Sequence, residues 1–135
     1  MPPYLEAGVD VRLGTDGAAS SGSGLNLLAE ARLASLVQRH DHWDATMMTA
    51  SQAFAMATRD SHDWVAWNLD DIRMHPRGRS DNRHLANLVF NGTDCLDVWA
   101  QGRALRRNGV TLSIDERAAA SALNDAVESY YEDVE

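Results

Sequence analysis

The spacing of hydrophobic and polar residues changes part-way along this chain. In the first half, apolar residues recur every three or four positions, which is typical of helices that cover a core with one face. A helix ending near Arg39 is predicted by the spacing of Leu25, Leu28, Leu33, Leu36 and Val37. Thr49 and Gln52 have the spacing of a capping box and predict the start of a short second helix that runs to Ala57.

Alternating or continuous apolar runs predict strands elsewhere. Near the start, a helical segment and a turn at Gly8 precede Val9, Val11 and Leu13, which alternate with charged residues and predict a strand. In the second half, strands are predicted by the apolar runs within 64–69, 86–90 and 96–100. The pairs Gln101-Gly102 and Asn108-Gly109 predict tight turns, the first of them in a hairpin.

The end of the chain predicts one more amphipathic helix. Ser113 and Glu116 have the spacing of a second capping box. The apolar stripe of this helix consists of Ala119, Leu123, Ala126, Val127, Tyr130 and Val134. Its last residues are acidic, which is unfavourable beside the negative C-terminal end of a helix, so we expect that end to fray.

Composition excludes several classes of protein. The 135 residues, 44% of them hydrophobic, are enough for one modest domain or part of a larger one. The formal charge of −8 argues against nucleic acid or an anionic membrane as a partner. Cys95 is the single cysteine and cannot form an internal disulfide, so we expect a cytoplasmic protein. No apolar stretch approaches the roughly 20 residues of a membrane-spanning helix.

Asp16 is the strongest candidate for chemistry. It lies between Gly14 and Gly17, directly after the first predicted strand and before the first long helix. A carboxylate at the C-terminal tip of a strand, flanked by glycines, is a common way for an α/β barrel to present a catalytic or metal-binding group. The alternative is that Asp16 only caps a turn or the start of a helix.

Other polar clusters have simpler interpretations. His40-Asp41-His42 imitates a pair of metal ligands, but residues two apart point to different faces of a helix, so we interpret it as a polar helix end. A basic cluster is either an anion site or, as we favour in an acidic chain, a solvated loop. It consists of Arg73, His75, Arg77, Arg79, Arg83 and His84. Cys95 is interpreted as a small packed thiol.

The sequence from Gly8 to Ser20, followed by Asn26 to Ala34, resembles the amidohydrolase superfamily at its last barrel strand and the helix after it. Within that superfamily it is most similar to the aminohydrolases and chlorohydrolases, which include guanine deaminase, S-adenosylhomocysteine deaminase and the triazine hydrolases. The segment 86–116 resembles the closing strands and helix of the same group.

The resemblance implies an α/β fold in three segments. Residues 1–60 would form the last βα unit of a metal-dependent hydrolase (β/α)8 barrel and its helices. Residues 61–112 would add strands of a small β-sandwich, and residues 113–135 a C-terminal helix. The resemblance also implies that about two dozen family residues are missing near Ser61.

In the family that this chain resembles, a zinc or iron ion lowers the pKa of a bound water. The resemblance implies that Asp16 contacts the metal, accepts the proton of the attacking water and passes it to the departing amine. The loop residues that would border the substrate, a small heterocyclic amine, are Ala18, Ala19, Ser20 and Ser21. The metal-binding histidines of the family would precede Met1, so the resemblance implies that this stretch of sequence supplies only one ligand, Asp16.

Two functions from different classes remain. The first is part of a metal-dependent amidohydrolase that hydrolyses C–N bonds and deaminates a purine- or triazine-like ring. The second is a non-catalytic truncated fragment that acts as an oligomerising or partner-binding module. For the isolated chain we favour the second, because zinc sites use three or four protein ligands and Asp16 supplies one. An unpaired barrel strand also predicts a homo-oligomer or a companion chain.

Overall fold

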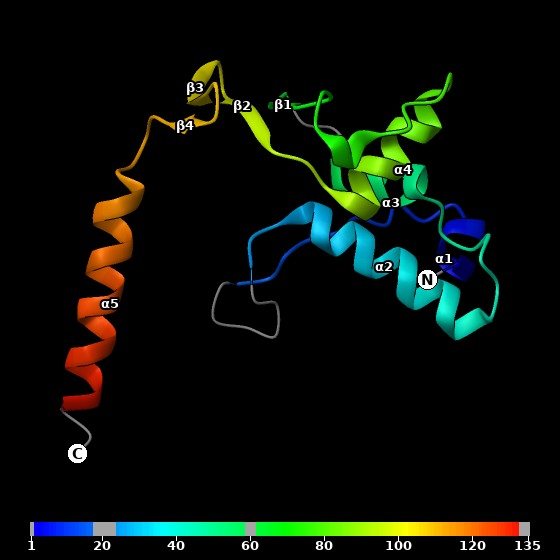
Figure 1. The fold of residues 1–135 in the computed structure, drawn as a ribbon. Helices are drawn as coiled ribbons and strands as arrows, with labels where there is room; N and C mark the ends of the chain where they lie inside the picture. Colours follow the sequence, from blue (N-terminus) through cyan, green and yellow to red (C-terminus); the bar gives the residue numbers. More distant parts are fainter. Residues whose placement is uncertain (1, 18–23, 59–61, 133–135) are drawn as a thin grey trace. The chain divides into compact units, whose positions relative to one another are not determined.

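The computed structural model describes residues 2–17, 24–58 and 62–132. The chain forms two compact units and passes between them more than once (Figure 1). The first unit comprises Met1–Ser61 and Leu69–Thr93, and the second comprises His62–Asn68 and Asp94–Glu135. The first unit is built from helices, whereas the second carries a sheet and a final helix.

The first unit packs around small and flexible apolar side chains. Its elements are α1 (Pro2–Glu6), α2 (Leu27–His42), α3 (Ala50–Thr58), the short 3-10 helix η1 (Ile72–Met74) and α4 (Asp81–Asn91). Helix α3 packs against both α2 and α4. The buried core cluster consists of Ala31, Met48, Ala50, Ala53, Met56 and Val89.

Local capping interactions fix where α2 and α3 begin. The side chain of Asn26 accepts hydrogen bonds from the backbone N–H groups of the first turn of α2. At α3, the backbone N–H of Thr49 donates to Gln52 Oε1 at 2.8 Å, and the backbone N–H of Gln52 donates to Thr49 Oγ1 at 3.2 Å. The predicted capping box is therefore confirmed.

The predicted strand at Val9–Leu13 is wrong, because the structure shows irregular backbone there. A barrel strand needs a hydrogen-bonded neighbour, and every strand that the structure describes lies after residue 63. The backbone N–H of Leu13 donates instead to the carbonyl of Met56 in α3, at 3.0 Å. The described residues before α2 therefore contain no strand that could complete a βα unit.

The predicted strand within 86–90 is also wrong, because these residues belong to α4. A short apolar run fits a strand or a buried helix equally well. In the helix, Leu88 and Val89 are buried, and Asn87 reaches back to the loop after η1. Its Nδ2 donates to the carbonyls of Met74 at 2.8 Å and Pro76 at 3.1 Å.

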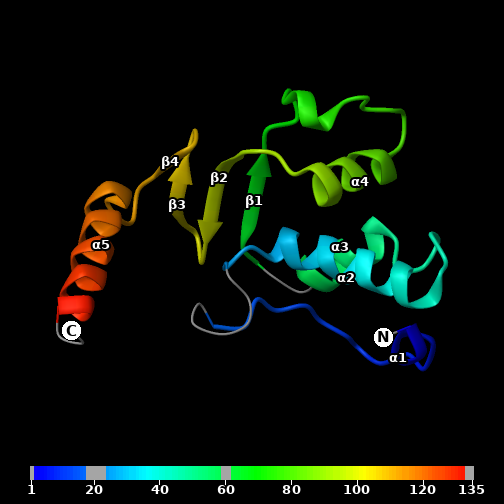
Figure 2. The same ribbon diagram turned by 60° about the horizontal axis from the view of Figure 1, so that its bottom comes forward.

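The second unit contains a four-stranded antiparallel sheet in the order β1-β2-β3-β4 (Figure 2). The strands are β1 (Trp64–Trp67), β2 (Cys95–Ala100), β3 (Arg103–Arg107) and β4 (Val110–Thr111). The strands predicted within 64–69 and 96–100 are thus confirmed. Trp64 and Trp99 are opposite one another, and their rings stack at 5.4 Å between centroids.

Both predicted turns in the sheet are confirmed. Gln101 and Gly102 have φ values of 51° and 74°, and they join β2 to β3. Asn108 and Gly109 have φ values of 48° and 78°, and they join β3 to β4. A two-residue turn with both φ values positive has the twist that an antiparallel hairpin needs, and glycine adopts it without steric cost.

The final helix is α5 (Glu116–Glu132). Its N-cap is Asp115, whose Oδ1 accepts from the backbone N–H groups of Arg117 and Ala118, each at 3.0 Å. The cap predicted at Ser113 is therefore wrong by two positions, because the helix begins at Glu116 and Asp115 is the residue directly before its first turn. None of the residues of α5 that the structure describes is buried. No helix in the described ranges combines the length and the apolarity needed to cross a membrane.

Candidate functional site

The segment that leads to Asp16 packs against the core of the helical unit through two side chains. Val11 and Leu13 are partly buried and pack against the core cluster. Asp10 and Arg12 alternate with them, are exposed, and form an ion pair at 3.1 Å. The predicted alternation therefore holds for Val11 and Leu13 but not for Val9, which is 49% exposed, and no strand forms.

Asp16 lies three residues beyond the Leu13 anchor, in an exposed turn. Its φ is 58°, in the left-handed region, which aspartate tolerates better than most residues. Its Oδ1 accepts a hydrogen bond from the backbone N–H of Gly17 at 2.7 Å, and the hydroxyl of Thr15 donates to its carbonyl at 3.2 Å. The carboxylate is thus held in a local turn and is open to solvent.

The residues around Asp16 do not complete a metal site in the described part of the chain. Zinc in a catalytic site has three protein ligands and an open position. Within the described ranges, no group of three or more His, Cys, Asp or Glu side chains could hold a metal ion. The predicted substrate-loop residues Ala18, Ala19, Ser20 and Ser21 lie outside the described residues.

The pair His40 and His42 lies in the last turn of α2, so this segment is a helix end, as interpreted. The Nδ1 atom of His42 lies 3.0 Å from the carbonyl oxygen of Gln38 in the same helix. Helix α2 ends at Trp43, whose φ of 51° is left-handed. The two histidine rings are used locally at this helix end and form no part of a ligand set with Asp16 in the described structure.

Arginines of the basic cluster are paired with nearby carboxylates. The guanidinium of Arg73 donates to both carboxylate oxygens of Asp71, at 2.9 and 2.6 Å. These bonds, with the backbone N–H of Arg73, lower the pKa of Asp71 to about 2. Arg77 is paired with Asp70. Both pairs reduce the free positive charge around Arg73 and Arg77, which favours a solvated surface over an anion site there. Arg83 and His84 of the same cluster lie in α4, so the prediction that they belong to a loop is wrong.

Cys95 is half-buried at the start of β2. Burial raises the pKa of its thiol, so the reactive thiolate is disfavoured. This environment agrees with the interpretation of Cys95 as a packed thiol.

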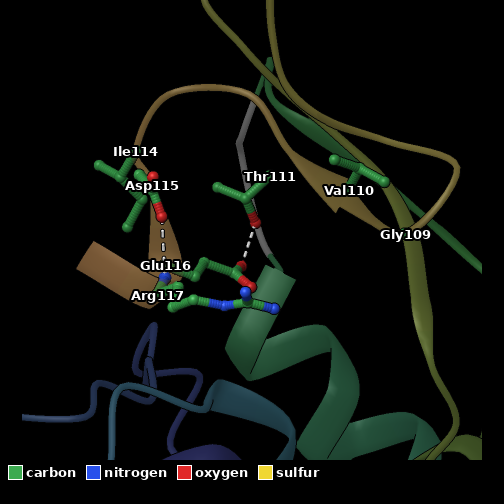
Figure 3. Close-up of a pocket in the computed structure, with 7 residues that line it drawn as sticks. All are labelled: Gly109, Val110, Thr111, Ile114, Asp115, Glu116 and Arg117. Atoms are coloured by element: carbon green, nitrogen blue, oxygen red, sulfur yellow. Dashed lines mark hydrogen bonds between the residues drawn. The ribbon is translucent and has the colours of Figure 1, made fainter. Parts of the chain in front are cut away.

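A hollow between β4 and the first turn of α5 was not anticipated from the sequence (Figure 3). Thr111 donates to Glu116, and Arg106 Nη1 donates to both, at 2.7 Å to Thr111 Oγ1 and 3.2 Å to Glu116 Oε1. Asp115 is occupied as the helix cap. These polar groups bond to one another and stabilise the junction between β4 and α5. The sequence signal that could have indicated this junction is Asp115, an N-cap residue directly before α5.

The segment with Asp16 and the helices after it match a known protein family. The model of the amidohydrolase family matches residues 1–70, which include the Asp16 segment, α2 and α3. The chain belongs to the amidohydrolase family. Within this amidohydrolase, the match covers helices α1, α2 and α3 of the first unit and strand β1 of the sheet.

Curated relatives are named as deaminases. This amidohydrolase is 30% identical over 137 residues to the 5-methylthioadenosine/S-adenosylhomocysteine deaminase of Syntrophomonas wolfei, a match that covers 87% of this chain and 31% of that protein. It is also 30% identical over 133 residues to the 5'-deoxyadenosine deaminase of Methanocaldococcus jannaschii, covering 86% of this chain and 30% of the relative. The chain therefore spans about a third of the length of these relatives.

Solved structures with bound zinc have a similar fold. An adenosine deaminase of Xanthomonas campestris with bound zinc has a TM-score of 0.77 at 20% identity, over 93% of this chain and 32% of that chain. A zinc complex of the atrazine chlorohydrolase of Arthrobacter aurescens TC1 has a TM-score of 0.70 at 27% identity, over 90% of this chain and 30% of that chain. The mixed helix-and-sheet architecture thus matches part of the length of amidohydrolase structures.

These relatives are hydrolases and deaminases, which supports C–N hydrolysis at the level of the family. Zinc is present in the structural neighbours. The described residues of this chain do not fit a complete zinc site, because Asp16 stands without further ligands among them.

Proposed function

We propose that this chain supplies the aspartate-bearing part of an amidohydrolase that deaminates a purine- or triazine-like ring. In this proposal residues 1–60 correspond to the last barrel segment and its helices, and the sheet belongs to the small β domain. The family match over residues 1–70, which contains Asp16, is the observation that carries the proposal. The names of the relatives, adenosine-type deaminases and a triazine chlorohydrolase, support the class of substrate.

Asp16 is proposed to move the proton in this reaction. Its carboxylate accepts a proton from the attacking water as the new C–O bond forms, and it gives a proton to the departing amine as the C–N bond breaks. Exposure of the side chain and its anchoring by Gly17 are compatible with this role. Loop residues 18–21 are proposed to border the ring.

The 135 residues are proposed to be inactive by themselves. One carboxylate does not hold zinc against water, so the remaining ligands come from a companion chain or from sequence outside these residues. We expect the purified chain to release no ammonia from adenosine derivatives or aminotriazines. One equivalent of bound metal, with turnover that Asp16→Asn abolishes, would show that the chain is active alone.

Complementation tests the role of Asp16 directly. The chain is co-expressed with the part of the Syntrophomonas wolfei deaminase that it does not match. We expect the two polypeptides to co-purify and release ammonia from a 5-methylthioadenosine-type substrate. Asp16→Asn should abolish turnover, whereas Asp10→Asn, an exposed carboxylate change in the same segment, should preserve it. Failure to co-purify, or activity that is equal in both variants, contradicts the proposal.

A second candidate is a non-catalytic oligomerising module. It is favoured by one observation, which is that α5 buries none of its described residues within the chain. This function is favoured over the first if the co-expressed complex neither binds zinc nor releases ammonia, and the chain associates with itself.

A further inference from the structure

Leu13 is joined to α3 through both its backbone and its side chain. Its backbone N–H donates to the carbonyl of Met56 at 3.0 Å, and its side chain is partly buried against the core cluster. The last four carbonyls of a helix have no partner within that helix, and Met56 is one of these residues in α3 (Ala50–Thr58). The bond from Leu13 therefore uses a carbonyl that the helix leaves open.

The acceptor of this bond belongs to a well-packed part of the helical unit. Met56 is 6% exposed and is a member of the core cluster. The helix that carries it packs against both α2 and α4. Side chains in a close-packed interior have little room to shift. Leu13 is thus attached to an element that is itself held on two sides.

The chain between Leu13 and Asp16 consists of Gly14 and Thr15. Gly14 is exposed, and no described heavy atom beyond its chain neighbours lies within 4 Å of the position that a Cβ would take there. The hydroxyl of Thr15 donates to the carbonyl of Asp16, so this bond shapes the turn itself. Three residues of extended chain span at most about 11 Å, so the anchor at Leu13 limits where the Asp16 carboxylate can move.

Proton transfer by Asp16 would depend on such a limit. A general base must come within about 2.6–3.2 Å of the atom whose proton it takes. A displacement of about 1 Å can reduce a rate by about 100-fold. The Asp16 side chain is exposed and accepts from the N–H of the next residue, Gly17. That bond moves with the turn and does not fix the turn to the helical unit.

We propose that Leu13 is a positioning residue for Asp16. Its bond to Met56 and its packing against the core hold the turn, so that the Asp16 carboxylate keeps one location relative to α3. Leu13 does not touch the reacting atoms in this scheme and acts through Asp16. The inference rests on the proposed role of Asp16 in proton transfer, and its first test does not use that activity.

NMR spectroscopy of the full 15N-labelled chain tests the anchor without any turnover. We expect the amide of Leu13 to exchange with solvent about tenfold or more slowly than the exposed amide of Gly14, after correction for their intrinsic rates. Leu13→Ala removes most of the packed side chain, so it should reduce this protection. The same variant should raise the picosecond–nanosecond mobility of the Asp16 and Gly17 amides.

Leu5→Ala is the matched control for this experiment. Leu5 is also partly buried against the core cluster, but it lies on α1, away from Asp16 in the sequence. The control loses the same side-chain atoms and should leave the mobility of Asp16 at its original value. Leu13→Met keeps the volume of the side chain and should restore it. Circular dichroism checks that each variant keeps its helices.

The complex with the unmatched part of the Syntrophomonas wolfei deaminase tests the consequence for the reaction. We expect Leu13→Ala to lower kcat about tenfold or more and to change KM by less than about twofold. The reason is that a misplaced proton carrier slows the reaction after the substrate has bound. Leu13→Met should restore kcat, and Leu5→Ala should leave it unchanged.

Two results overturn the positioning role of Leu13. One is an Asp16 mobility that is the same in Leu13→Ala and Leu5→Ala, and the other is an equal fall of kcat in both variants. An original complex that releases no ammonia contradicts the proposed function instead. The mobility of Asp16 in the full chain then decides whether Leu13 is its anchor.

Discussion

Replacing Asn87 by alanine should destabilise the helical unit strongly. Asn87 is 7% exposed, and its Nδ2 donates to the carbonyls of Met74 and Pro76 at 2.8 and 3.1 Å. The variant removes both bonds and leaves the carbonyl of Met74, a residue that is 1% exposed, without its partner. A lost hydrogen bond costs about 1 kcal/mol, and an unsatisfied buried group about 1–3 kcal/mol. We expect the free energy of unfolding to fall by roughly 2–4 kcal/mol.

Urea denaturation followed by circular dichroism, at one fixed protein concentration, measures this loss. Asn82→Ala is the matched control in the same helix. Its side chain is exposed and accepts a hydrogen bond from the Ser51 hydroxyl at 3.1 Å, so we expect a change within about 0.5 kcal/mol. An Asn87→Ala variant as stable as this control would refute the hydrogen bonds from Asn87 to the carbonyls of Met74 and Pro76, because it would show that this side chain does not hold the loop after η1.

Thr49→Ala should lower the free energy of unfolding by about 1 kcal/mol in urea titration, because it removes the hydroxyl that caps α3; an unchanged midpoint would contradict the capping box with Gln52. The pKa of Asp71 is lowered to about 2 by the bonds from Arg73, so its stabilising contribution is complete above about pH 4 and is lost as the pH falls through 2. Arg73→Gln should raise the pKa of Asp71 in an NMR titration, and an unshifted titration would refute the pairing. Asp16→Asn should leave the thermal midpoint unchanged, because the side chain is exposed and bonds to its own neighbour; a large decrease would indicate a structural role.

Features that depend on a few adjacent residues could be predicted from the sequence. The capping box at Thr49 and the turns at Gln101-Gly102 and Asn108-Gly109 are confirmed because a side-chain acceptor or a positive φ decides each of them locally. The final cap lies at Asp115 and not at Ser113 because α5 begins at Glu116, so that Asp115 is the residue whose side chain reaches the free N–H groups of the first turn.

Two strand predictions failed because pairing partners are not local. Residues 86–90 have no strand beside them in the structure, and as a helix they bury Leu88 and Val89. Residues 10–13 alternate between exposed and partly buried side chains, whereas Val9 is exposed, and the N–H of Leu13 bonds to α3 instead of a strand. At Leu88 and Val89, and in part at Val11 and Leu13, the apolar pattern predicted burial, but it did not predict the hydrogen-bond partners of the backbone.

The turn at Asp16 could be predicted from its motif, whereas its role in a metal site stays a prediction. The glycines on either side of Asp16 predict a turn that leaves room for a ligand near the backbone. The structure shows a turn there, in which the backbone of Asp16 is in the left-handed region. A metal site depends on side chains that meet from separate segments, and the described residues bring no such group together. Residues 18–21 lie outside the described ranges, so their role at the substrate remains a prediction.

The metal content of the chain tests the central claim most directly. Zinc is measured in the 135-residue chain alone and in its complex with the unmatched part of the Syntrophomonas wolfei deaminase. We predict no stoichiometric zinc in the isolated chain, and one equivalent in the complex that Asp16→Asn weakens and Asp10→Asn does not. One tightly bound equivalent in the isolated chain, or a complex whose zinc affinity is the same in both variants, would contradict the account.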